Sequence, residues 1–439
     1  MKSRFVVKCK KAAVREIGDF MKKYLYPATV LLPDFNRIDG RRWATVACDQ
    51  YTSQKDYWER IRELVKDMPS TLDLMLPEAY LDREEEMIPL INENMERYLE
   101  GVLCERENTM IYLERTQSDG RVRRGIIGCV DLEDYDYSRG SETLIRATEG
   151  TVLERIPPRV AIRRGAVIEM PHIMILIDDP RKTVIEPIAN KAQSLEIAYD
   201  FDLMENSGHV KGYFVAPSDL DVINTALGAL ATRDCMNEKY SVDAAPLLFA
   251  MGDGNHSLAS AKALYEEIKS EIGDEAAKAH PARFALCEIV NLHDTALDFE
   301  PIYRAVFGAD ADDFKKSFEE YASVLNGSAD AQNVTLVGVD GDCEIEIPTP
   351  VSQLAVGTVQ NFLDEYVKAN DGVTVDYIHG EDTVRELVKS GGAVGILYEG
   401  MGKDKLFKTV ICDGALPKKT FSMGHAADKR FYIECRKIR

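Results

Sequence analysis

The hexapeptide Gly-Asp-Gly-Asn-His-Ser at residues 252–257 concentrates residue types that bind phosphate and divalent metal ions. It follows an apolar run ending at Met251, and the residues after it have helical spacing. A glycine-rich turn at a helix start presents free backbone N–H groups where the helix dipole is positive, which suits phosphate. The pattern predicts a strand over 247–251, an exposed turn over 252–255 and a helix over about 256–269.

Each residue of this loop has a chemical role if the loop binds phosphate. Gly252 and Gly254 would let the backbone approach a ligand and adopt positive φ, and Asn255 would join the phosphate cradle. His256 could donate to a phosphate oxygen. Asp253 could hold Mg²⁺ through an oxygen or orient an acceptor, because Mg²⁺ takes few protein carboxylates together with substrate phosphates.

The same loop also has a structural interpretation. Asp-Gly is a common turn, Asn255 or Ser257 could cap the helix, and His256 could satisfy a backbone group. The segment matches neither the GxxxxGK[ST] nor the GxGxxG nucleotide fingerprint, so spacing alone leaves both interpretations open.

The composition is that of a globular protein: 439 residues, 45% hydrophobic and 29% charged. The net charge of −20 disfavours nucleic acid and anionic membranes as partners. No stretch has the roughly 20 apolar residues of a membrane span, and the basic N-terminus has no apolar signal region. Nine cysteines are scattered without a CxxC pair, so we expect a reduced, cytoplasmic protein.

Strand and helix patterns alternate along the chain and predict a mixed α/β fold. Residues 1–305 are expected to form the main domain, and 306–439 a smaller α+β lobe that returns to the core. Ser53 is expected to cap a helix, and 181–202 to form a helix despite an early proline. Two strands joined by a turn are expected over 110–117 and 123–135.

The loop and three further segments resemble the DUF1015 family of uncharacterised bacterial proteins. The segments are "YDYSRGSETLIRATEGTVLERIPPRV" (135–160), "FEPIYRAVFG" (299–308) and "LPKKTFSMGH" (416–425). The family has a DGHHR loop. Asp253, Gly254 and His256 match it, Asn255 replaces its first His, and Ser257 replaces its Arg, which would be a phosphate clamp.

The other two motifs match in part. Arg304 matches the family's Pro-x-His-Arg motif, whereas Tyr303 replaces its His. Lys418, Lys419 and Thr420 fall on the Lys-Ser-Thr positions of a C-terminal loop. We expect Lys418 or Lys419 to lie near the glycine-rich loop, where a lysine would offset the missing arginine.

The family's loop is similar to that of the ParB/sulfiredoxin-like fold, which includes free-serine kinases and nucleotide-dependent switches. The resemblance implies a ParB/sulfiredoxin-like strand–DGxH–helix element in the main domain. It also implies a nucleotide cofactor (ATP, ADP or CTP) with Mg²⁺. This implication rests on analogy with the fold and not on the residues themselves.

The positive charge and the base that phosphate chemistry needs can be sought nearby. Arg146 and Glu149 are close in sequence, and Arg146 and Arg304 are candidate charge clamps with Glu149 as the candidate base. The alternative is a solvated, salt-bridged hairpin. Asp49 ends a predicted strand and stays open, and His172 is expected to be structural.

Two functions from different classes follow. The first is a nucleotide-dependent phosphotransferase acting on a small hydroxylated metabolite. The second is a non-catalytic nucleotide- or phosphometabolite-binding regulator, for which a homo-oligomer is left open. Hydrolysis of a phosphoester by the same groups, with water as the acceptor, is a third alternative.

Overall fold

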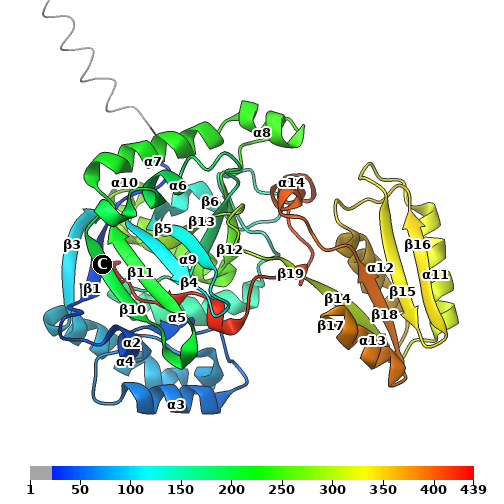
Figure 1. Cartoon of the computed structure of the whole chain (residues 1–439), viewed down its shortest axis with the longest axis horizontal. Coiled ribbons are helices and arrows are strands. Elements are labelled where there is room, and N and C mark those ends of the chain that lie inside the picture. Colours follow the sequence, from blue (N-terminus) through cyan, green and yellow to red (C-terminus); the bar gives the residue numbers. More distant parts are fainter. Residues whose placement is uncertain (1–21) are drawn as a thin grey trace, which may run out of the picture.

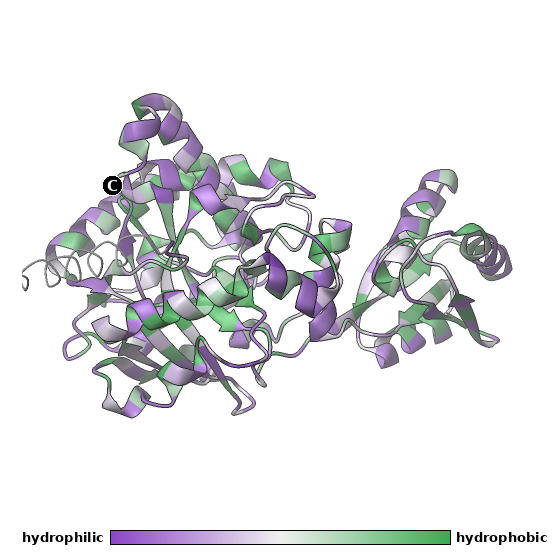
Figure 2. Cartoon of the chain, turned by 90° about the horizontal axis from the view of Figure 1, so that it is seen from above, coloured by the Kyte–Doolittle hydropathy of each residue, from purple (hydrophilic) through white to green (hydrophobic). Residues whose placement is uncertain are grey.

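The computed structural model describes residues 22–439. A larger part is built on a nine-stranded sheet and a smaller part on a six-stranded sheet, and few segments join the two (Figure 1). Seen from above, hydrophilic and hydrophobic residues alternate along the helices of both parts (Figure 2). The mixed α/β class is confirmed. The N-terminal segment considered for a secretory signal lies outside the described residues.

The larger sheet is mixed, with antiparallel pairs at one side, one parallel pair in the middle and two parallel pairs at the other side. Its apolar central strands are buried, as expected of strands covered on both faces. In spatial order its strands are β10 (Ile197–Asp202), β11 (His209–Phe214), β4 (Ile111–Thr116), β5 (Val122–Asp131), β13 (Phe284–Asn291), β9 (Met174–Ile177), β12 (Phe249–Asp253), β7 (Ile145–Arg146) and β6 (Tyr135–Asp136). The hairpin expected over 110–135 is β4–β5.

The glycine-rich loop joins β12 to α9 (Asn255–Ile272), so the predicted strand–turn–helix unit is confirmed. Leu258, Ala261 and Leu264 of α9 are at most 2% exposed. They pack into the core and against α5 (Ile156–Gly165), which anchors the start of α9 rigidly. The strand reaches Asp253, so the turn is tighter than predicted.

Two local predictions were wrong. Residues 181–202 form the short helix α6 (Glu186–Ala189), a 3-10 turn over 192–194 and then β10. Pro187 lies in the first turn of α6 and prevents the helix from starting earlier, and the segment after it pairs with β11. Helix α3 (Lys55–Val65) starts after Gln54 without a side-chain cap, so Ser53 does not cap it.

The smaller sheet has the order β16 (Gly341–Ile347), β15 (Gln332–Gly338), β18 (Ala393–Tyr398), β14 (Glu300–Phe307) and β17 (Thr374–His379), with β19 (Phe421–Ser422) pairing to β14. Helices α11 (Ala311–Val324) and α12 (Ala355–Ala369) pack on the face that carries Leu336. Helix α13 (Glu381–Lys389) packs on the opposite face, which carries Val337. The proposed boundary at 305/306 remains a prediction, and β14 runs across it.

After α14 (Lys403–Asp413) the chain returns to the larger part. There β20 (Phe431–Tyr432) pairs with β2 (Thr45–Val46), and β21 (Arg436–Lys437) with β8 (Ile168–Glu169). Arg430 docks this tail through a buried ion pair with Glu288 (2.8 Å), and a second pair with Glu434 (2.7 Å) lies within the tail. Buried charges of this kind must be paired, so the return of the tail is tightly specified.

The remaining helices and strands surround these sheets. They are β1 (Ala28–Pro33), α2 (Gly40–Trp43), α4 (Glu84–Gly101), β3 (Leu103–Thr109), α7 (Pro217–Leu230), α8 (Arg233–Tyr240) and α10 (Asp274–Ala277).

Candidate functional site

A polar pocket of about 220 Å³ lies at the end of β12, with walls from both parts of the protein. It brings together five of the sequence-predicted residues: Glu149, Gly252, Asp253, Asn255 and Lys419. Its other lining residues are Thr148 and Lys429 from the larger part and Ile302, His379, Phe421, Ser422 and Met423 from the smaller part and its return loop.

Helix α9 begins at this pocket, and no side chain caps its first turn. Gly254 is the N-cap residue, with φ +76°, and the first intrahelical bond runs from Leu258 N to Gly254 O (3.0 Å). The expected positive φ therefore occurs at Gly254 and not at Gly252. Because neither Asn255 nor Ser257 caps the helix, its first-turn N–H groups remain available to an anion.

Asp253 is paired with a lysine that the sequence analysis did not identify. Lys429 Nζ lies 3.1 Å from Asp253 Oδ2, and the two side chains are 18% and 23% exposed. The other carboxylate oxygen accepts from Gly254 N at 2.9 Å. Lys429 is 176 residues from Asp253 in sequence, and no local pattern marks it.

Glu149 is the second carboxyl group of the pocket. Burial raises its pKa, and the charge of Asp253 raises it further. Lys419 and Lys429 oppose this shift. The segment that carries Glu149 is held by Leu416, whose N–H donates to Thr148 O at 2.6 Å. A carboxyl group with a raised pKa suits proton transfer near neutral pH.

Lys419 lines the pocket, and a buried arginine holds the backbone of its loop. Arg304, 0% exposed, donates to Ile302 O (2.6 Å), Lys418 O (3.0 Å) and Lys419 O (3.2 Å). Lys418 instead lies over the Tyr377 ring, 5.6 Å from its centroid. The expected approach of one loop lysine to the glycine-rich loop is thus confirmed for Lys419, while Arg304 holds backbone carbonyls.

Three other predicted residues lie outside the polar pocket. Arg146 is buried and donates to Thr143 O (2.8 Å) and Ala245 O (2.9 Å). His256 Nε2 accepts from Val152 N at 3.3 Å, so the ring hydrogen is on Nδ1. Burial lowers the pKa of His256, and two nearby arginines lower it further. Ser257 lines a separate apolar cavity.

The pocket has two residues that carry oxygen ligands of the kind Mg²⁺ binds, Asp253 and Asn255. Asn255 Oδ1 is buried and has no hydrogen-bond donor among the described residues. Within 22–439 there is no cluster of three His, Cys, Asp or Glu side chains that could hold a metal ion. A divalent ion here would therefore need phosphate oxygens or water to complete its ligands.

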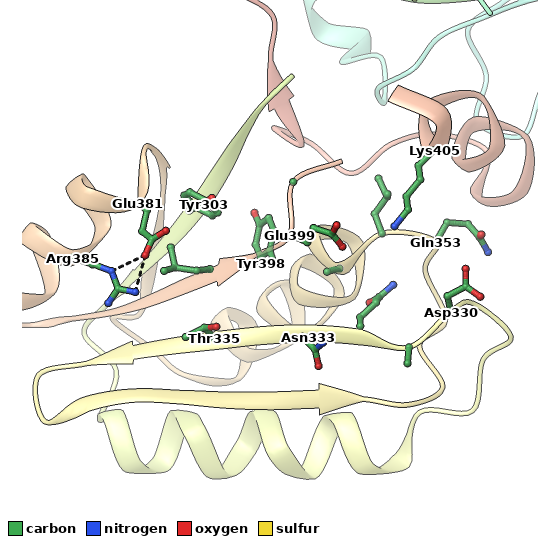
Figure 3. Close-up of a pocket in the computed structure, with 16 residues that line it drawn as sticks. Tyr303, Asp330, Asn333, Thr335, Gln353, Glu381, Arg385, Tyr398, Glu399 and Lys405 are labelled. Carbon is green, nitrogen blue, oxygen red and sulfur yellow. Dashed lines mark hydrogen bonds and ion pairs between the residues drawn. The ribbon is translucent and has the colours of Figure 1, made fainter. Parts of the chain in front are cut away.

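A larger hollow of about 480 Å³ lies on the smaller sheet (Figure 3). Its arginine, Arg385, is already paired with Glu381 and Asp342 at 2.8 and 2.9 Å. None of the sequence-predicted residues lines it. The hollow does have Lys405 and the start of α12 in its wall. The smaller polar pocket is the better candidate for phosphate chemistry, because it joins two lysines and a helix start to the carboxyl groups of Glu149 and Asp253.

A model of the family described as "Protein of unknown function (DUF1015)" matches residues 33–366. The search of curated proteins found no match. Among solved structures, the chain is similar to a conserved hypothetical protein from Pyrococcus furiosus, with a TM-score of 0.32, 11% identity, and coverage of 71% of this chain and 94% of that one.

Two further solved structures show similarity at the same level. One is a free serine kinase in complex with AMP, with a TM-score of 0.34, 11% identity, and coverage of 71% of this chain and 91% of that one. The other is SbnI with a C-terminal truncation from Staphylococcus aureus, with a TM-score of 0.32, 11% identity, and coverage of 70% and 82%. At these scores the similarities are remote, and function must be argued from the chain's own residues.

None of the helices within residues 22–439 combines the length and apolar composition needed to cross a bilayer.

Proposed function

The chain belongs to the DUF1015 family of proteins of unknown function, and we propose that its polar pocket transfers a phosphoryl group from a nucleotide to a hydroxyl group of a small metabolite. One observation carries the proposal. The uncapped start of α9 shares a pocket with two lysines and with a carboxyl group whose pKa is raised.

The phosphate end of the nucleotide would lie against α9. Phosphoryl transfer requires positioning and neutralisation of charge more than covalent help from the protein. The amides of the first turn of α9 would donate to phosphate oxygens, and Lys419 and Lys429 would supply positive charge. Asp253 would keep Lys429 oriented across the pocket, as their 3.1 Å contact already does.

Glu149 would act as the general base. It would take the hydroxyl proton as the acceptor oxygen bonds to phosphorus and the bond between phosphorus and the leaving oxygen breaks. Asp253 and Asn255 would hold Mg²⁺, which supplies charge neutralisation when bound. A small acceptor fits a pocket of about 220 Å³ and a protein of net charge −20 better than a nucleic acid does.

The test is incubation of the full chain with ATP, ADP or CTP, Mg²⁺ and a pool of hydroxylated metabolites, followed by ³¹P NMR and mass spectrometry. We expect loss of nucleotide and a new phosphomonoester, both strongly reduced in Glu149→Gln. The proposal fails if no nucleotide is consumed and none binds below millimolar concentration.

Two other outcomes would replace the proposed reaction with an alternative. Release of inorganic phosphate without an added acceptor would make the protein a phosphoester hydrolase. Tight nucleotide binding without turnover, with a change of oligomeric state, would make it a regulator.

A further inference from the structure

An apolar cavity of about 120 Å³ lies on the far side of the first turn of α9 from the polar pocket. Aliphatic and thioether side chains from three segments form most of its wall, including Leu74, Met75, Met95, Ile162 and Met170. Ser257 and His172 line it too. Building on the function proposed above, we propose that this cavity binds the base of the nucleotide whose phosphates occupy the polar pocket.

The position of the two cavities on α9 supports one ligand spanning both. Asn255 lines the polar pocket and Ser257 lines the apolar cavity. Two residues of a helix differ by about 200° in direction and 3 Å in height, so the two cavities flank a single helical turn. Gly254 lies at the junction, since a Cβ there would be 3.3 Å from His172 Cδ2. A nucleotide joins an apolar ring to phosphates over such a short span.

Asp49 connects the two cavities electrostatically. Burial disfavours its charge, yet nearby His172, the Gln50 side chain and Lys429 hold its pKa below the usual range. Asp49 lines neither cavity, but His172 lines the apolar cavity and Lys429 lines the polar pocket, so one carboxylate interacts with a residue of each.

The wall of the apolar cavity suits a flat aromatic ring. Met75, Met95 and Met170 line it, and methionine side chains favour aromatic contacts and adapt to a flat ring.

The experiment compares ADP with inorganic pyrophosphate by titration calorimetry, in the presence of Mg²⁺. Pyrophosphate has the phosphates without the base, so the parent should bind ADP at least tenfold more tightly. Met170→Trp, which fills the apolar cavity, should remove that advantage and leave pyrophosphate affinity unchanged. Leu90→Trp, at a position 54% exposed on α4, is the matched control and should change neither.

The outcomes separate this inference from the proposed function. Equal binding of ADP and pyrophosphate by the parent, or an ADP advantage that survives in Met170→Trp, overturns the base subsite alone. Absence of binding of both by the parent overturns the proposed function as well. If Met170→Trp does not fold, Ile162→Trp fills the cavity from α5 and decides the question.

A crosslink provides a second measurement that needs no variant. Photolysis with 8-azido-ADP should label peptides containing residues 74–76 or 159–170, which line the apolar cavity. Labelling confined to residues 330–335 or 381–385, beside the hollow of Figure 3, would overturn the inference.

Discussion

Replacing Glu149 with glutamine should slow turnover strongly and at the same time stabilise the fold at neutral pH. The side chain keeps its size and loses its charge. Its pKa is raised first by burial and then by Asp253, so the ionised form is disfavoured where it lies. A base held in this way works against folding, which is a common cost of a functional site.

Proton linkage gives the direction in which the free energy of unfolding changes with pH. A folded-state pKa above the unfolded value means that the folded protein binds more protons between the two values. Stability contributed by the protonated group is therefore present below the unfolded pKa, near 4.3, and is lost as pH rises through the folded pKa. Each unit of such a shift is worth about 1.4 kcal/mol. Glu149→Gln should match the parent near pH 4 and exceed it at pH 7.

The rate should change in the opposite sense. Loss of a general base typically costs about 10²–10⁴-fold in rate. In the parent, kcat/KM should rise with pH as Glu149 loses its proton, and residual activity in Glu149→Gln should lack that rise. Urea unfolding at both pH values and phosphomonoester formation measure the two effects.

The matched control is Glu142→Gln, an exposed carboxylate in the same segment that does not line the polar pocket. It should leave the rate and the pH dependence of stability at parental values. A Glu149→Gln variant that loses stability at pH 7 but keeps parental turnover would refute the role of this residue as a base.

Four further outcomes follow from the described contacts. Asp253→Asn should lower Mg²⁺-dependent nucleotide affinity by about 10²-fold, the order seen when a key electrostatic group is lost, with the melting temperature nearly unchanged; parental affinity by calorimetry would contradict the site. Lys419→Met should weaken ADP binding about tenfold, whereas its neighbour variant Lys418→Met should not, because only the former lines the polar pocket; equal effects would contradict the geometry. Gly254→Ala should cost about 1–2 kcal/mol in urea unfolding, since φ is +76°, and an unchanged midpoint would exclude that strain. Arg430→Met should cost about 3–5 kcal/mol, because buried Glu434 loses its ion pair and Glu288 keeps only Arg123, and a loss under 1 kcal/mol would show that the tail does not depend on these pairs.

The glycine-rich loop could be predicted because its signals are local. An apolar run, two glycines and a helical pattern lie within about twenty residues, and the strand, turn and helix follow from them. The expectation of a nearby loop lysine also succeeded, since a family motif marked that loop. The mixed α/β class followed from the alternation of patterns along the chain.

The rest of the site depends on contacts that sequence spacing does not encode. Lys429 meets Asp253 only after the chain has built the smaller sheet and returned. Arg146 and Arg304 looked like free positive charges, yet both donate to backbone carbonyls. A sequence does not show whether a guanidinium faces a ligand or a carbonyl, because the partner is set by tertiary packing.

The late position of the return segment has a consequence for biosynthesis. Ribosomes make the chain from the N-terminus, so Glu149, Asp253 and five of the six strands of the smaller sheet are polymerised before Lys419 and Lys429. A nascent chain can therefore contain both carboxylates before it contains either lysine of the polar pocket. Lys429 directly precedes Arg430, so we expect the pocket to gain its full positive charge only when this last segment docks on Glu288.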